Sequence, residues 1–267
     1  MTEWFVARLP AGAEDQGRRW HDIGEEIAAL AEWLTQVSPA QCMRVAQAGM
    51  RYATRNGPFH AWLRFCEEAL TGEIADAERS DLLWILVQVA LSGGFPDRAL
   101  AAAREKRELD LKRGAEFEAA IAAGFVADIL QARGQLDEAL KIRNEEQLPV
   151  YERLGDVREH AVTMHWISQI WQARGNLNES SRILREDVLP IYERLGDVQA
   201  LLRGRWGLAG LLLKQEEQGD REEAHRLLQL ALADARRLKL PEAQQIEQIL
   251  AGARLGDDAN PPPWDDP

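Results

Sequence analysis

The stretch Leu148-Pro-Val-Tyr-Glu-Arg-Leu-Gly-Asp-Val157 recurs almost unchanged as Leu189-Pro-Ile-Tyr-Glu-Arg-Leu-Gly-Asp-Val198. The two copies differ at one position in ten and begin 41 residues apart. The shorter stretches Gln131-Ala-Arg-Gly134 and Gln172-Ala-Arg-Gly175 keep the same spacing, so a whole unit repeats. Self-similarity at a period of roughly twenty to fifty residues is the signature of proteins built from stacked repeats. The sequence therefore predicts a stacked-repeat architecture.

Glycines divide the chain after Gly72 into helix pairs. Because glycine adopts positive φ easily, it commonly ends a helix. The glycines within pairs are Gly94, Gly134, Gly175 and, after a short insertion, Gly219, and those between pairs are Gly114, Gly155 and Gly196. This spacing predicts helix pairs over 76–113, 116–154, 157–195 and 198–238, and a final helix near 241–254. Asp97, Asp137 and Asp156 are expected to cap helix N-termini, with Glu159 at the capping-box offset from Asp156.

Two prolines interrupt the predicted helices. Pro149 and Pro190 occupy matching positions inside the second helix of their pairs. A proline in a helix interior removes one hydrogen bond and clashes with the preceding turn, at a cost of roughly 3 kcal/mol. We therefore expect a kink or a restart of the helix at both positions.

The two ends of the chain differ from the repeats. Residues 1–20 mix charged residues, glycine and proline without a helical period and are expected to form a loosely ordered arm. Helical periodicity and capping signals predict N-terminal helices within 21–72, where the pair 38–72 is a candidate degenerate repeat. The solenoid is expected over 73–255. The acidic, proline-rich tail 256–267 is expected to be disordered, either as a solvated end or as a linear motif anchored by Trp264.

Charge and cysteine content restrict the possible partners. The 267-residue chain has a net charge of −12 and a pI near 5.0. This balance disfavours nucleic acid and anionic membranes as main ligands, and favours partners of basic or apolar character. Cys42 and Cys66 have no CxxC pairing, which argues against a disulfide framework or a zinc knuckle. Without a signal-peptide or membrane-spanning run, the protein is expected to be cytoplasmic.

These features resemble the tetratricopeptide repeat family, in the long variety of about 40 residues per repeat found in kinesin light chains and bacterial regulators. The resemblance rests on Gly134-Gln-Leu-Asp-Glu-Ala139 and Gly94-Phe-Pro-Asp-Arg-Ala99, and on large apolar residues ahead of the turn, such as Ile167 with Trp171. It covers about residues 76–238. The sequence departs from the pattern at Ser180, where alanine is usual, and at the displaced glycine of the fourth pair.

The resemblance implies an all-α, right-handed superhelical solenoid whose concave groove is lined by the first helix of each pair. Residues counted back from each turn are then candidates for gripping an extended peptide or a helix. The candidates are Trp84, Gln88, Asp128, Gln131, His165, Gln169, Gln172, Arg203 and Trp206. The alternative for the tryptophans is packing between helices, and the alternative for the glutamines is a solvated helix surface.

The sequence indicates no catalytic, cofactor or metal site. His160 and His165 are five residues apart, unlike the four-residue spacing of a helical zinc site. Phosphate-binding glycine loops, dinucleotide-binding motifs and nucleophile elbows are also missing. Cys42 with His60 is a conceivable nucleophile and base, but a structural cysteine is the simpler interpretation because no orienting acid can be identified.

We therefore predict a non-enzymatic protein-interaction module that binds a protein or peptide partner in the groove. Two alternatives remain open. One is a regulatory or sensor subunit that controls a separately encoded effector, such as a protease or an ATPase. The other is a self-assembling scaffold, in which terminal helices form a homodimer.

Overall fold

The glycine turns have the backbone that the sequence predicts. In the computed structural model, Gly94 and Gly155 have φ values of 76° and 67°, and the other predicted turn glycines share this left-handed region. After Gly94 the backbone N–H of Phe95 donates to the carbonyl of Ala90 at 2.8 Å, which closes the last turn of the preceding helix. This arrangement satisfies carbonyl groups that a helix end leaves without a partner. The same closure recurs after Gly114, where Ala115 donates to Asp110.

The structure describes residues 59–215, 217 and 219–255, together with Met43, Ala46, Met50 and Thr54. Within this part of the chain the regular elements are all helical. They are α4 (Phe59–Leu70), α5 (Asp76–Ser92), α6 (Pro96–Lys112), α7 (Glu116–Ala132), α8 (Leu136–Ile142), η1 (Arg143–Gln147), α9 (Leu148–Leu154), α10 (Val157–Ala173), α11 (Leu177–Arg182), η2 (Ile183–Val188), α12 (Leu189–Leu195), α13 (Val198–Gln215), α14 (Asp220–Leu238) and α15 (Glu242–Leu255). The helix pairs and the final helix are therefore confirmed.

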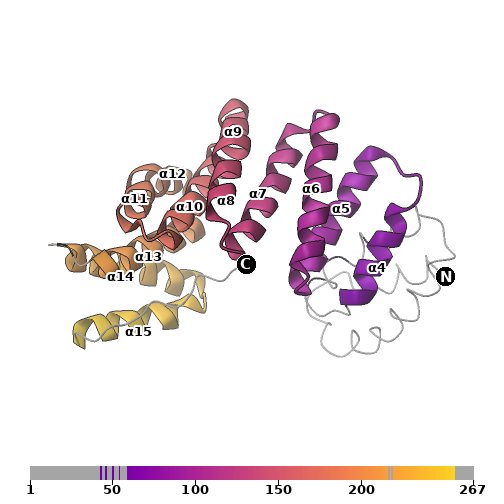
Figure 1. Cartoon of the computed structure of the whole chain (residues 1–267). Coiled ribbons are helices and arrows are strands. Elements are labelled where there is room, and N and C mark those ends of the chain that lie inside the picture. The colour runs from indigo at the N-terminus through magenta and orange to yellow at the C-terminus, as the bar shows by residue number, and fades with distance from the viewer. Residues whose placement is uncertain are drawn as a thin grey trace. The chain divides into compact units, whose positions relative to one another are not determined.

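The chain divides into two compact units, Met1–Arg133 and Gly134–Pro267. In the first unit α5 packs between α4 and α6, and α7 packs against α6 (Figure 1). Trp62 and Leu63 of α4 are buried, as are Leu82 and Leu83 of α5. Small residues dominate the buried side of α7, including Ala119. Their small size favours the close packing of α7 against α6.

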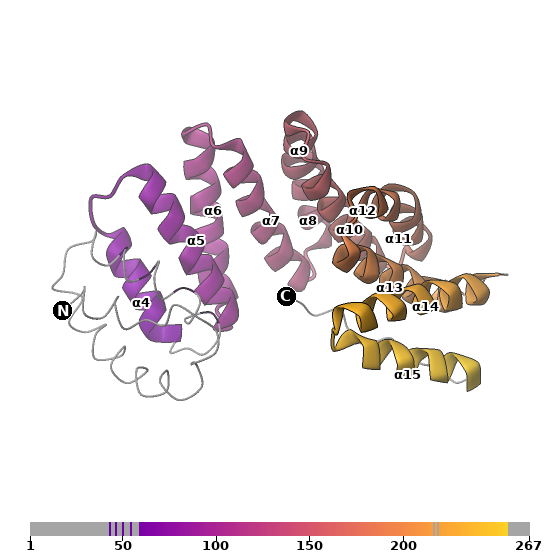
Figure 2. The same ribbon diagram turned by 180° about the vertical axis from the view of Figure 1, so that it is seen from behind.

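In the second unit each helix pair packs on the next, from α8 to α15 (Figure 2). A single apolar cluster contains side chains from α10 through α15. Leu202 and Leu212 of α13 meet Leu228 of α14 in this cluster, and Ile246 of α15 closes it. The displaced glycine turn therefore leaves the fourth pair well packed, with Gly219 at the start of α14 and a φ of 91°.

The two prolines follow short π-helical segments. The N–H of Leu148 donates to the carbonyl of Arg143, and the N–H of Leu189 donates to Leu184, which are bonds spanning five residues. The wider π turn relieves the clash that Pro149 and Pro190 would otherwise make with the preceding turn. The expected restart is thus confirmed, since α9 and α12 begin one residue before the prolines.

The π segments also explain a difference in length between the repeats. Gly94 and Gly114 lie 20 residues apart, whereas Gly134 and Gly155 lie 21 apart, as do Gly175 and Gly196. The two longer intervals are the ones that contain a π segment. A π turn accommodates one additional residue within a continuous helix. The extra residue is therefore absorbed without disturbing the turns at either end.

The predicted N-caps are correct at one position and wrong at two. Asp156 accepts a hydrogen bond from the backbone of Glu159 at 3.0 Å, as expected. Asp97 and Asp137, in contrast, lie inside the first turns of α6 and α8, whose N-cap residues are Phe95 and Gln135. Their carboxylates instead bind arginines at the ends of the following first helices, as described in the Discussion.

Several expectations lie outside the described residues: the arm 1–20, most of the N-terminal helices before residue 59, Cys42 and the tail with Trp264. Met43, Ala46, Met50 and Thr54, within the predicted pair 38–72, are helical. The division of 21–72 from the solenoid stays a prediction.

Among the described helices, none is both long enough and apolar enough to span a bilayer.

Candidate functional site

The candidate residues of the first unit lie on α5 and α7. Trp84 and Gln88 are half-buried on α5, and Asp128 and Gln131 are half-buried on α7. The ring of Trp84 packs edge-on against Phe125 with 5.0 Å between ring centroids. Trp84 therefore has at least one packing role, which was the alternative for the tryptophans.

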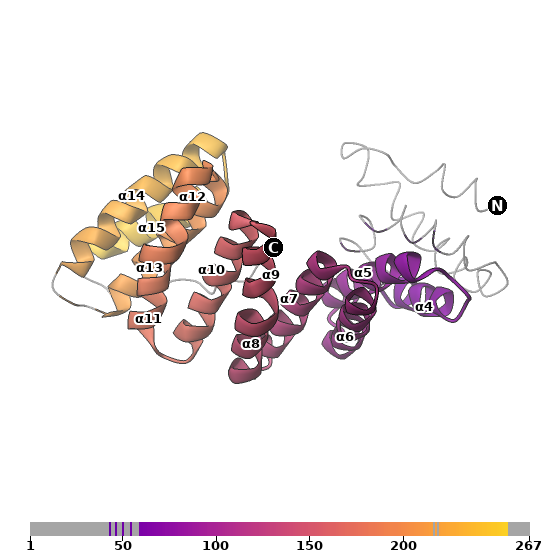
Figure 3. The ribbon, with the colours of Figure 1, turned by 90° about the horizontal axis from the view of Figure 1, so that it is seen from above.

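In the second unit, candidate residues and their neighbours line one side of α10 and one side of α13. Val162, His165, Gln169 and Gln172 lie on one side of α10, and Arg203, Gly207, Gly210 and Lys214 follow one side of α13. These spacings of three, four and seven residues place side chains on the same face of a helix. We call this set the α10–α13 face. Figure 3 shows the two helices in the second unit, viewed from above.

His165 on α10 interacts electrostatically with Arg203 on α13. Burial of its imidazole, together with the smaller effect of the nearby Arg203 guanidinium, lowers the pKa of His165 to about 4. The imidazole ring lies 6.5 Å from the ring of Tyr192 in α12, between centroids. At neutral pH the α10–α13 face therefore presents an uncharged imidazole beside a cation.

Three polar side chains of this face have no partner within the part of the chain that the structure describes. Gln169 and Gln172 are half-buried and Arg203 is exposed. None of the three forms a hydrogen bond or ion pair with the residues that the structure describes. Half-buried amides usually find a partner in the protein or in water. These groups are therefore available for contacts with another molecule.

Trp206 has a different position from the other candidates. Its side chain is only 6% exposed and packs in the apolar cluster of the second unit with Leu202 and Leu228. The structure thus assigns Trp206 to the core beneath the α10–α13 face, in line with the packing alternative. Replacing it with alanine would leave a large cavity, at a cost of roughly 3–5 kcal/mol. Such a variant cannot separate binding from folding.

Lys214 belongs to the same face but was not among the predicted residues. It is exposed and forms no ion pair with a described residue. A signal for it exists in the sequence, because the segment 198–215 contains three basic residues and no acid. Counting back from the turn does not identify Lys214, because this rule uses fixed positions and ignores the charge of the whole helix.

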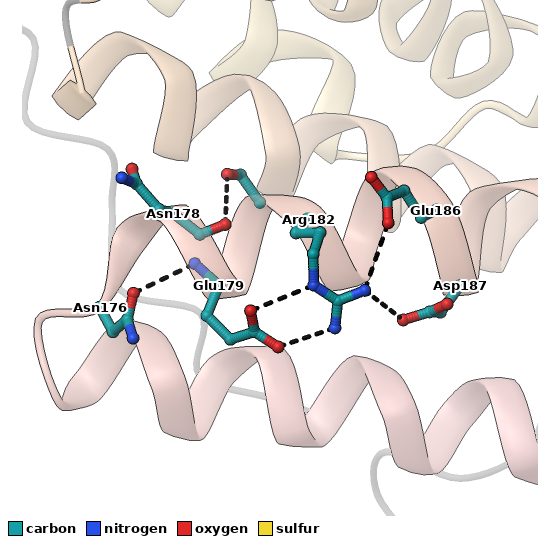
Figure 4. A network of polar contacts seen from close by, with 7 residues as sticks. Asn176, Asn178, Glu179, Arg182, Glu186 and Asp187 are labelled. Atoms are coloured by element: carbon teal, nitrogen blue, oxygen red, sulfur yellow. Dashed lines mark hydrogen bonds and ion pairs between the residues drawn. The ribbon is translucent and has the colours of Figure 1, made fainter.

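The second helices of the pairs carry a contrasting polar surface. On α11 and η2, Arg182 is held by Glu179 at 2.7 Å and by Glu186 and Asp187 at 3.3 Å each (Figure 4). The side chain of Asn176 caps α11 by accepting from the backbone of Glu179 at 3.1 Å. The hydrogen bonds that Arg182 donates to Glu179 raise the pKa of its guanidinium above the usual range. Because these groups satisfy one another, the network has less capacity for a new partner.

The described residues contain no group of three or more histidine, cysteine or acidic side chains that could hold a metal ion. Cys66 is buried in α4. The ring of His60 packs against Phe95, with 4.7 Å between centroids.

Comparisons with known proteins agree on the fold. No family model and no curated protein matches the sequence. A kinesin light chain-type protein from Podosopora anserina, with nearly identical TPR-like repeats, superposes with a TM-score of 0.60 at 18% identity, over 75% of this chain and 98% of that chain. The fold is that of the tetratricopeptide repeats. The expected resemblance is thus confirmed at the level of structure.

Two larger proteins contain the same tetratricopeptide fold. Aspartyl phosphate phosphatase F from Bacillus subtilis has a TM-score of 0.71 at 11% identity, over 94% of this chain and 64% of that chain. A signal-transduction ATPase with a tetratricopeptide repeat sensor from Pyrococcus horikoshii has a TM-score of 0.66 at 13% identity, over 96% and 38%. This chain therefore spans less than two thirds of each. At such identities the comparisons show a shared fold, and function has to be argued from the site.

Proposed function

We propose that this protein is a non-enzymatic interaction module that binds a protein or peptide partner on the α10–α13 face. The observation that carries the proposal is the set of unpartnered polar groups on Gln169, Gln172 and Arg203. They lie on two successive first helices, α10 and α13, whereas the polar network of α11 is satisfied internally. A rigid surface with unsatisfied donors and acceptors binds at little cost in conformational entropy.

A regulatory role is the second candidate. It is favoured by the neighbour from Pyrococcus horikoshii, in which the tetratricopeptide repeats are the sensor of a signal-transduction ATPase. In this candidate role the repeats would control a separately encoded effector. Both candidates require a partner on the repeats, so the same surface tests them.

The test is affinity capture from a cell lysate with three purified proteins. The face variant carries Gln169→Ala and Arg203→Ala, and the matched control carries Arg226→Ala and Gln248→Ala. Arg226 and Gln248 are exposed on α14 and α15 and form no ion pair or hydrogen bond with a described residue. Circular dichroism establishes that all three proteins have equal helicity. We expect a partner to be retained by the wild type and the control and lost by the face variant.

If the face variant retains the same proteins as the wild type, the assignment of the face is wrong. A partner that is lost with the control variant alone would place the binding surface on α14 and α15. A ligand-dependent rise in melting temperature without any added protein would favour the sensor.

A further inference from the structure

The exposed apolar side chains of the repeats are concentrated on one edge of the helix pairs. Among the described residues, seven large apolar side chains are exposed. Six of them lie within three residues of a left-handed residue that joins one helix pair to the next element: Leu111, Phe117, Leu154, Val157, Leu195 and Leu238. None lies within three residues of a glycine turn inside a pair. Both edges contain helix ends, so exposure of helix ends alone does not explain the difference.

The turns themselves do not require these apolar side chains. Backbone hydrogen bonds and the capping carboxylate of Asp156 hold the turn between α9 and α10. The side chains of Leu154 and Val157 take no part in these bonds. At the turn between α6 and α7, which closes with the same backbone bond, the equivalent residues are Arg113 and Glu116. Charged side chains are therefore compatible with this turn, and the apolar ones need another explanation.

Two of these turns lie side by side in the second unit. The Nε atom of Arg158, in the first turn of α10, lies 3.1 Å from the carboxylate of Asp197, which precedes α13. Leu154 is 51% exposed, Val157 is 41% exposed and Leu195 is 45% exposed on the same two turns. We call these three side chains the turn patch. They expose on the order of 200–300 Å² together, and apolar patches of a few hundred square ångströms are often functional.

Charges around the turn patch are balanced, unlike those of the whole chain. The chain has 44 acidic and 32 basic residues, so two copies repel each other on average. Within three residues of the two turn glycines, four acids accompany three bases: Glu152, Asp156, Glu193 and Asp197 with Arg153, Arg158 and Arg194. Arg205, which binds Glu193 at 3.0 Å, supplies a fourth base. A second copy therefore meets no net repulsion here, and the Glu-Arg-Leu sequence repeated at both turns makes the surface complementary to itself.

The final helix offers no comparable surface for self-association. Its apolar residues Ile246, Ile249 and Leu250 are buried in the core of the second unit. The exposed side chains of residues 242–250 are all polar: Gln244, Gln245, Glu247 and Gln248. A contact between copies is therefore better supported at the turn patch than at α15, one of the terminal helices considered for a homodimer.

We propose that the turn patch is the contact between two copies of this chain, related by a two-fold axis. Leu154 and Val157 of one copy pack against Leu195 of the second copy, and the glutamates and arginines beside them form the rim. Standard interfaces bury roughly 800 Å² per partner, which is more than the turn patch exposes, so the dimer should be weak and dependent on concentration. The contact uses none of the residues of the α10–α13 face, so failure of either proposal leaves the other standing.

Sedimentation equilibrium of the purified full-length chain measures this association. We expect the wild type to shift from the chain mass of 30.1 kDa towards twice that mass as its concentration is raised. Leu195→Glu should weaken the dimer about a hundredfold, because a roughly tenfold loss per contact occurs twice at a two-fold interface. Leu230→Glu is the matched control, since Leu230 is exposed on α14 away from the turns and the substitution adds the same charge. It should leave the association unchanged.

Leu195→Lys separates loss of the apolar contact from a change in net charge. It reduces the negative charge of the chain but should still weaken the dimer, and circular dichroism establishes that every variant keeps its helicity. The proposal is overturned if the wild type stays monomeric up to millimolar concentration, or if Leu230→Glu weakens association as much as Leu195→Glu. It also fails if Leu195→Lys associates as tightly as the wild type. A mass that keeps rising beyond two chains would contradict a closed two-fold dimer.

Discussion

Arg174, at the C-terminus of α10, binds the carboxylate of Asp137 in the first turn of α8. The same bond occurs one repeat earlier, where Arg133 binds Asp97 at 2.6 Å. One repeat later the pair is Gln215 and Asn178, whose side-chain amides are hydrogen-bonded. Each pair joins the end of a first helix to the start of the second helix of the preceding repeat. A periodic polar contact therefore stabilises the junctions between repeats, and its last member is uncharged.

The arginine of such a pair should matter more to stability than the aspartate. Asp137 is 99% exposed, and exposed ion pairs contribute roughly 0–1 kcal/mol. Arg174 also lies over the ring of Trp171, 5.0 Å from its centroid, and this contact does not depend on Asp137. We expect Arg174→Ala to lower the free energy of unfolding more than Asp137→Ala does, as measured by urea denaturation. A larger effect of Asp137→Ala would contradict this account.

Ser180→Ala should stabilise the protein. The side chain of Ser180 is 1% exposed, and its hydroxyl has no hydrogen-bond partner. The equivalent positions are alanines, Ala99 and Ala139, each fully buried. Removing a buried, unsatisfied hydroxyl should raise the free energy of unfolding by about 1 kcal/mol.

The adjacent Ser181 provides the control for that change. Its hydroxyl is also buried but donates to the backbone carbonyl of Asn178 at 3.0 Å. Ser181→Ala should therefore destabilise the protein or leave it unchanged in the same denaturation experiment. If both substitutions have the same effect, the difference in hydrogen bonding does not govern stability here.

Much of the fold follows from the repeat of glycines and large apolar residues, because turn glycines and helix periods are local properties. The π segments were not anticipated, although the 21-residue interval between Gly134 and Gly155 contained the signal. The incorrect prediction of Asp97 and Asp137 as N-caps has a physical cause. Asp97 and Asp137 lie one residue inside their helices and are drawn to arginines of the next repeat, a long-range contact that a local capping rule cannot detect.

The candidate site was less predictable than the fold. Counting back from the turns placed the polar residues of α10 on one side of the helix, since helical spacing fixes direction. It could not predict that Trp206 is buried whereas Trp84 is only half-buried, because burial depends on the packing of helices distant in sequence. The absence of acids from the segment 198–215 was visible in the sequence, but the sequence could not show which of its arginines are already paired.

Two glycines of α13 should respond differently to substitution by alanine. A Cβ atom at Gly204 would lie 2.7 Å from Leu189 Cδ2, whereas one at Gly207 would meet its nearest atom at 3.7 Å. Alanine favours the helix by roughly 1 kcal/mol at either position. Gly207→Ala should therefore raise the melting temperature. Gly204→Ala should lower it, because the clash with Leu189 outweighs the gain in helix propensity.

Equal melting temperatures for the two alanine variants would show that α12 shifts freely to accommodate the added methyl group. The close approach of α12 to α13 at Gly204 would then not be a constraint on this part of the fold.

Stability should decrease on acidification through His165. Its pKa is about 4 in the folded protein against 6.5 for an unperturbed histidine, so the unfolded state binds the proton more readily. This contribution is absent above pH 6.5 and destabilises the folded state progressively as the pH falls towards 4. His165→Gln should flatten the dependence of the unfolding free energy on pH between 6.5 and 4. An unchanged slope would contradict the burial of the imidazole.

Site-specific photo-crosslinking tests the central claim most directly. A photoreactive phenylalanine analogue is placed at Gln169 on the α10–α13 face and, in a matched protein, at Gln248 on α15, and both are irradiated in lysate. We expect covalent adducts with a partner protein at position 169 that are lost when Arg203→Ala is added, and none of these adducts at position 248. Equal adducts at both positions, or adducts at position 248 alone, would contradict binding on the α10–α13 face.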